Sequence, residues 1–140
     1  MPWNTYDLVA LSLTPRLTHA DRIRLIRNHS NLEGALPEIG QSGLGLEEPT
    51  ERVLADCESH NVRIVGWGDE SYPRRLAEIN APPSLIYIKG DLPDEDLPTI
   101  SVVGTRTCTT HYGKPATEKL VTQWVHAGIV IISGLANGID

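Results

Sequence analysis

The residues best suited to binding chemistry follow an apolar run near the end of the chain. Val102 and Val103 close a strand-like segment, Gly104 comes next, and residues 105–112 hold four threonines and one arginine before an expected helix. Glycine permits a sharp turn, and a helix start offers unpaired N–H groups and the positive end of its dipole. Thr105 can donate from its hydroxyl, and Arg106 can give a planar two-pronged donor to a phosphate. We therefore predict an anion site in this loop.

A second loop of small residues, ISGLANGID at 132–140, follows another apolar segment. Ser133 and Gly134 stand where that segment ends. The carboxyl ends of neighbouring parallel strands meet at one edge of a sheet, so we expect this loop beside the Gly104 loop. A structural alternative is that the glycines of both loops only permit turns and that Arg106 is a solvated surface residue.

Other side chains in these segments limit the chemistry. Tyr112 is close enough to the proposed crevice to stack on a base, whereas Trp124 is expected in the core. His111 has no second histidine at metal spacing, and Ser133 has no identifiable base, so we predict no metal, no cofactor and no catalytic group. The G-x-G-x-x-G spacing and the Walker pattern are both absent, since the next glycine after Gly104 is Gly113.

The elements that carry these loops form a strand, loop, helix and strand order. TISVV, an amphipathic helix from about Lys114 to Ala127 and GIVIISG predict a βαβ unit with a parallel sheet. Before it, VRIVGW and LIYIKG predict two strands, and SYPRRLAEI predicts a short helix between them. The sequence is thus typical of an α/β protein.

The first sixty residues show apolar residues at helical spacing. Plausible helix caps are Thr18, which pairs with Asp21 in a capping box, Asn31 and Thr50. The basic side chains of this region are interpreted as a solvated helix face; they are Arg16, Arg22, Arg24 and Arg27. We predict a helical module over residues 1–60 and a second domain over residues 61–140.

Composition excludes several classes of protein. The chain has 140 residues and a net charge of −6, which argues against coating nucleic acid by bulk attraction. Residues 1–99 hold nine basic and sixteen acidic side chains, whereas residues 100–140 hold three and two. Two cysteines give no disulfide framework, and the first residues lack the features of a secretory signal. The expected location is therefore the cytoplasm.

Three segments together carry a family resemblance: YPRRLAEINAPPSLIYIKG, then VVGTR with YG a few residues on, then ISGLANGID. In order and spacing they resemble the DNA-processing protein A family (DprA, also called Smf) over residues from about Asn61 to Asp140. The helical start is similar to the sterile-alpha-motif-like or helix-hairpin-helix-like extension of many members. Where a helix-hairpin-helix would have glycines, this chain has Arg16 and Thr18.

The resemblance implies the amino-terminal part of a Rossmann-like domain that continues beyond Asp140. It implies binding and protection of single-stranded DNA, loading of the RecA recombinase in natural transformation, and a homodimer of the full-length protein, with no enzymatic activity. Because no apolar run is long enough to span a bilayer, we also expect no membrane insertion. Gly104, Thr105 and Arg106 match the family's G-[ST]-R segment, with Arg106 as the expected phosphate contact. Ser133 and Gly134 begin its S-G-x-A-x-G-I-D segment. We expect weak DNA binding from this chain alone.

Two other functional classes stay open. Rossmann-like phosphoribohydrolases, similar to the lysine-decarboxylase-like family, handle nucleoside monophosphates, but their P-G-G-x-G-T loop and catalytic glutamate are absent from these residues. A pure interaction protein would use the helical module to recruit partners and would leave the glycine loops inert.

Overall fold

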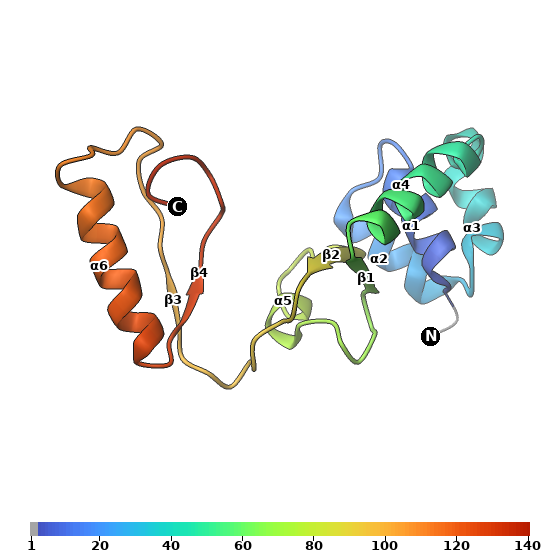
Figure 1. The fold of residues 1–140 in the computed structure, drawn as a ribbon. Coiled ribbons are helices and arrows are strands. Elements are labelled where there is room, and N and C mark those ends of the chain that lie inside the picture. The colour runs from blue at the N-terminus through green and yellow to red at the C-terminus, as the bar shows by residue number, and fades with distance from the viewer. Residues whose placement is uncertain (1–2) are drawn as a thin grey trace. The chain divides into compact units, whose positions relative to one another are not determined.

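The structure is a computed structural model that describes residues 3–140, and it divides into two compact units (Figure 1). The first unit ends at Leu92 and the second begins at Pro93. Within the described residues, no helix has the length and apolar character needed to span a bilayer.

The first unit begins with a bundle of helices, as the apolar spacing predicts. The α-helices are α1 (Thr5–Leu13), α2 (His19–Asn28), α3 (Leu32–Ile39) and α4 (Glu47–Ser59), with a 3-10 turn η1 (Gly40–Gly43) after α3. Two of the three predicted caps are confirmed. Thr18 and Asp21 form a complete capping box, and the Asn31 side chain accepts from the Gly34 N–H at 2.8 Å.

The predicted cap at Thr50 is wrong. Helix α4 begins three residues earlier, at Glu47, and its first turn has no side-chain cap. Thr50 lies inside the helix and is fully buried. Packing of α4 against α1, which is not visible in local sequence, therefore sets where this helix starts.

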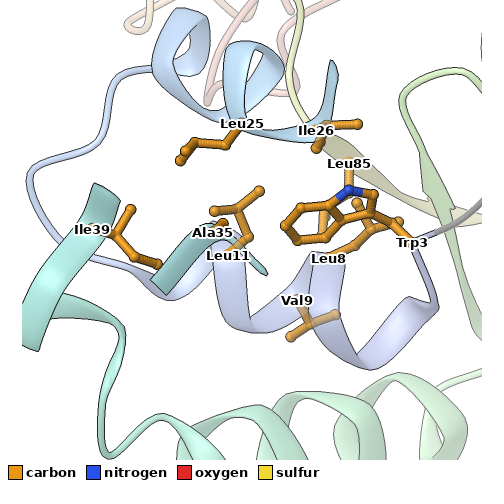
Figure 2. Packing of buried hydrophobic residues seen from close by; sticks show 9 residues of the cluster. All are labelled: Trp3, Leu8, Val9, Leu11, Leu25, Ile26, Ala35, Ile39 and Leu85. Carbon is orange, nitrogen blue, oxygen red and sulfur yellow. The ribbon is translucent and has the colours of Figure 1, made fainter. Parts of the chain in front are cut away.

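The core of the first unit lies between α1, α2 and α3 (Figure 2). Its fully buried members include Val9, Leu11, Leu25 and Ala35, and the indole of Trp3 donates to the His29 carbonyl at 2.7 Å. Burial of each large aliphatic side chain contributes roughly 1.5–3 kcal/mol to folding.

Arg22 does not belong to a solvated basic face. Its guanidinium donates to the carbonyls of Leu11, Ser12 and Thr14 at 3.1, 3.0 and 3.0 Å. These carbonyls lie at the carboxyl end of α1, where backbone carbonyls have few hydrogen-bond partners within the helix. The expected stripe of four arginines is therefore wrong for Arg22, which ties α2 to the end of α1.

Replacing Arg22 with alanine should lower the free energy of unfolding by about 2 kcal/mol, because hydrogen bonds from a charged donor to three carbonyls are lost. Chemical denaturation followed by circular dichroism measures this change. Arg52→Ala is the matched control, since Arg52 only makes an exposed pair with Glu48, and its effect should stay within about 0.5 kcal/mol. Equal effects of the two substitutions would show that Arg22 is no better held than a surface arginine.

Strands β1 (Val62–Gly66) and β2 (Leu85–Lys89) pair antiparallel, with Ile64 opposite Tyr87, and form a sheet of their own. Helix α5 (Arg74–Ala77) lies between them in the chain, and the Tyr72 hydroxyl donates to the Pro83 carbonyl at 2.9 Å.

The β1–β2 sheet belongs with the helices in this structure. Leu85 joins the helical core, and a Cβ on Gly66 would lie 2.4 Å from the Leu8 side chain. The compact units therefore divide after Leu92. The division into a helical module over residues 1–60 and a second domain over residues 61–140 stays a prediction.

The second unit contains the predicted βαβ order. Strands β3 (Thr99–Ser101) and β4 (Val130–Ile132) pair in parallel, and helix α6 (Gly113–His126) connects them and runs alongside (Figure 1). Trp124, expected in the core, is only half-buried. The α/β fold class is confirmed, with a helical bundle first and a parallel strand pair last.

Candidate functional site

The two predicted loops lie side by side at the carboxyl ends of β3 and β4. The N–H of Gly104 donates to a carboxylate oxygen of Asp140 at 3.0 Å, and the N–H of Ile139 donates to the Thr105 carbonyl at 3.1 Å. Within the second loop, the Ser133 hydroxyl donates to the Asp140 carbonyl at 2.9 Å. The prediction that both loops share one edge of the sheet is therefore confirmed.

Glycine is required where the loops touch. Gly138 has φ +104°, and a Cβ there would lie 2.1 Å from the Thr105 carbonyl oxygen and 2.7 Å from the Arg106 Cα. A Cβ on Gly104 would lie 2.7 Å from the Ile139 Cβ. The close approach of backbone to backbone therefore explains the glycine at each of these positions better than turn formation alone.

The start of α6 does not offer the free N–H groups that the sequence suggests. Thr109 folds back on the helix, so that its hydroxyl accepts from the Gly113 N–H at 3.0 Å and its carbonyl accepts from the Lys114 N–H at 3.1 Å. Pro115 has no N–H, and the Ala116 N–H donates to the Tyr112 carbonyl at 2.9 Å. The predicted role of the helix start as an anion site is therefore wrong.

The Gly104 loop keeps two unused donors instead. Among residues 3–140, the backbone N–H groups of Thr105 and Arg106 have no hydrogen-bond partner, whereas the Thr107 N–H donates to the Thr105 hydroxyl at 3.2 Å. Consecutive free amides of this kind are suited to an anion. The loop backbone, rather than the helix, therefore supplies the donors.

An open pocket of about 570 Å³ lies where the first loop, α6 and the end of the second loop meet. Four charged side chains line it: Arg106, Lys114, Glu118 and Asp140. Lys114 and Glu118 stand 3.9 Å apart on one helix face, and Arg106 is exposed and forms no ion pair with any described residue. Arg106 is thus the cation in this pocket that is available to a ligand.

The predicted site residues divide into three groups. Arg106 lines the pocket, and Gly104 and Thr105 shape the loop that holds it. Ser133 and Gly134 lie in the second loop outside the pocket lining, and the Ser133 hydroxyl donates to the Asp140 carbonyl, so their contact with DNA stays a prediction. Tyr112 is 79% exposed and also outside the lining, so its stacking on a base stays a prediction.

Sequence reasoning did not assign a role in this site to three residues that contribute to it. Lys114 brings a second cation, and its place in the first turn after Tyr112-Gly113 was the available signal. Gly138 and Asp140 join the two loops, but the sequence identified them only as members of the family's S-G-x-A-x-G-I-D segment. Asp140 acts on Gly104 across 36 residues, which no local pattern reports.

A model of the family described as DNA recombination-mediator protein A matches residues 63–140, which is more than half of the chain and includes both loops. The chain belongs to this family. The resemblance drawn from the three sequence segments is therefore confirmed.

Similar curated proteins carry consistent names. Protein Smf of Synechocystis is 37% identical over 93 residues, covering 64% of this chain and 23% of that protein. The DNA processing protein DprA of Streptococcus pneumoniae is 42% identical over 72 residues, covering 51% of this chain and 25% of that protein. The DNA processing protein DprA of Bacillus subtilis is 37% identical over 90 residues, covering 64% and 30%. This family member therefore spans less than a third of each of these relatives.

Proposed function

We propose that the loop pocket binds a phosphate of single-stranded DNA. In this proposal, the chain forms part of the DNA-binding surface of a DNA recombination mediator. In the whole protein, we propose that this binding protects the strand and supports RecA loading, in the cytoplasm and as a homodimer. Membership in the recombination-mediator family and the names of the relatives support this choice of ligand. The proposal assigns binding, rather than catalysis, to the pocket.

One observation carries the proposal: Arg106 extends from a loop whose own backbone keeps the amides of Thr105 and Arg106 unused. A guanidinium and two adjacent amides can together surround phosphate oxygens. Phosphate contacts hold a strand without reading its sequence, so the expected binding shows little base preference.

Charge limits the expected affinity. Arg106 and Lys114 face Glu118 and Asp140 in the same pocket, and residues 93–140 contain three basic and five acidic side chains in all. Such a balance gives no long-range attraction for a polyanion. Binding by this chain should therefore be weak and should depend on local geometry at Arg106.

The test is fluorescence anisotropy of a labelled oligo-dT titrated with the wild-type chain and with Arg106→Ala at two salt concentrations. Loss of a charge-assisted phosphate contact should cost roughly 1.5–3 kcal/mol of binding free energy. It should also reduce the slope of the logarithm of the binding constant against the logarithm of salt concentration by about 1.

Lys119→Ala provides the matched control, because it removes one positive charge from α6 outside the pocket lining. Its effect should be much smaller than that of Arg106→Ala. Equal affinity of wild type and Arg106→Ala would remove the loop from the DNA-binding surface. Displacement of oligo-dT by a nucleoside monophosphate at low concentration would instead favour the nucleotide-processing alternative.

A further inference from the structure

A second pocket, in the first unit, is formed by α2 and the segment that follows α5. Its volume is about 360 Å³, within the range of small-molecule and nucleotide sites. Its polar side chains are Arg24, Arg27, Asn28 and Asn80, and none of the lining residues that the structure describes is acidic. Residues 1–92 hold nine basic and thirteen acidic side chains. The pocket lining is therefore more positive than the unit as a whole.

The two arginines of this pocket differ in how far they are neutralised. Arg24 is bound by Glu38 at 2.5 Å, and Glu38 also contacts His29 at 2.7 Å. Arg27 forms no ion pair among residues 3–140, and its guanidinium carbon lies 4.9 Å from the centre of the Trp67 ring. The stack on Trp67 fixes the plane of the Arg27 guanidinium and keeps its charge available.

The remaining walls of the pocket are suited to a flat, partly apolar ligand. Ile23 and Pro82 are buried and Ile79 is 49% exposed, so the pocket has apolar sides. Nucleic-acid bases stack on arginine planes and apolar side chains, and the amides of Asn28 and Asn80 can pair with base edges as donor and acceptor. An acidic peptide can bind the guanidinium groups and the amides, but it carries no planar base to lie between the apolar sides.

We infer that this α2–α5 pocket binds one nucleotide of single-stranded DNA, with the phosphate on Arg27 and the base between the apolar sides and the asparagines. The inference rests on the proposed function for its choice of ligand, but the pocket is formed by different residues from the loop pocket. The first unit then contributes to DNA binding through side chains on α2 and after α5.

The experiment is an NMR titration of the full chain with a short oligo-dT. We expect the side-chain amide signals of Asn28 and Asn80 and the indole N–H signal of Trp67 to shift. In Arg27→Ala, the oligonucleotide concentration that gives half of the maximal shift should rise roughly tenfold for these signals. The Gly104 signal should respond as in wild type. Arg52→Ala is the matched control for loss of one exposed positive charge on another helix of the same unit, and it should leave all of these signals responsive.

Each outcome separates this inference from the proposed function. Silent Asn28, Asn80 and Trp67 signals with a responsive Gly104 signal would overturn the α2–α5 pocket and leave the loop pocket in place. The reverse pattern would overturn the loop pocket alone, and silence at both sites would overturn both. Equal shifts at equal concentrations of a polyglutamate peptide would identify an acidic-peptide site and would also overturn the inference.

A second variant keeps the test decisive if Arg27→Ala perturbs folding through loss of the Trp67 stack. Asn80→Asp places a carboxylate at an exposed position of the pocket without touching that stack. Repulsion of the phosphate should weaken the oligo-dT response at Asn28 and Trp67 by roughly tenfold at low salt. An unchanged response in Asn80→Asp would count against a phosphate in this pocket.

Discussion

Gly138→Ala should separate the two loops of the candidate site and destabilise the fold of the second unit around them. An alanine at φ +104° costs about 1–3 kcal/mol in backbone strain. Its Cβ would also meet the Thr105 carbonyl oxygen at 2.1 Å, and backbone cannot turn away as a side chain can. The bonds from Ile139 to Thr105 and from Gly104 to Asp140 should then be lost, and oligo-dT binding at Arg106 should weaken by tenfold or more.

The matched control for this prediction is Gly128→Ala. Gly128 also has a positive φ, +78°, and also lies in residues 93–140, but a Cβ there would meet nothing within 4 Å. The control therefore carries backbone strain without the clash. Amide chemical shifts of Gly104 and Thr105 are the measurement: they should move strongly in Gly138→Ala and little in Gly128→Ala. Similar spectra for the two variants would show that strain alone, rather than contact between the loops, explains Gly138.

The sequence predicted the features that depend on near neighbours. Thr18 and Asp21 are three residues apart and form their capping box within one helical turn, so the pattern and the structure agree. The apolar runs before Gly104 and Ser133 likewise predict two strands, and the helix expected between them predicts their parallel pairing as β3 and β4. Such features are fixed by local hydrogen bonding and by the period of apolar residues.

The features that sequence reasoning missed depend on contacts that apolar periodicity does not report, some of them distant and one of them local. Thr50 was expected to begin a helix because its side chain suits a cap, yet packing against α1 places it inside α4. Arg22 was expected in solvent, yet it donates to carbonyls 8 to 11 residues away. The amides at the start of α6 were expected to be free, yet a fold-back at Thr109 uses them. Arg22 and the α6 amides thus find partners that periodicity alone cannot locate, whereas the Thr50 hydroxyl is buried without a hydrogen-bond partner among residues 3–140.

Asp140 both stabilises the contact between the two loops and lines the pocket that is proposed to bind a phosphate. Its carboxylate holds the Gly104 amide, which fixes the loop that carries Arg106, but it also brings negative charge into the pocket that Arg106 lines. The same carboxylate that stabilises the loop therefore weakens the electrostatic attraction of the pocket for an anion. This balance explains why the pocket depends on a small number of well-placed donors rather than on a positive field.

Leu25→Ala should be among the most destabilising substitutions in the first unit, lowering the free energy of unfolding by about 2–5 kcal/mol. Leu25 is fully buried and belongs to the cluster drawn in Figure 2, together with side chains of α1 and α3. Removing its outer carbons takes away buried apolar contact and leaves a cavity that neighbouring helices fill only in part. Urea denaturation followed by circular dichroism measures the loss.

The control for Leu25→Ala is Leu44→Ala, which makes the same chemical change at a side chain that is 62% exposed. Its effect should stay within about 0.5 kcal/mol. Because Leu25 lies on α2 between Arg24 and Arg27, the loss should also displace the two arginines of the α2–α5 pocket. A small loss of stability in Leu25→Ala, equal to that of Leu44→Ala, would mean that α2 is not anchored by this core and that the α2–α5 pocket lacks a rigid wall.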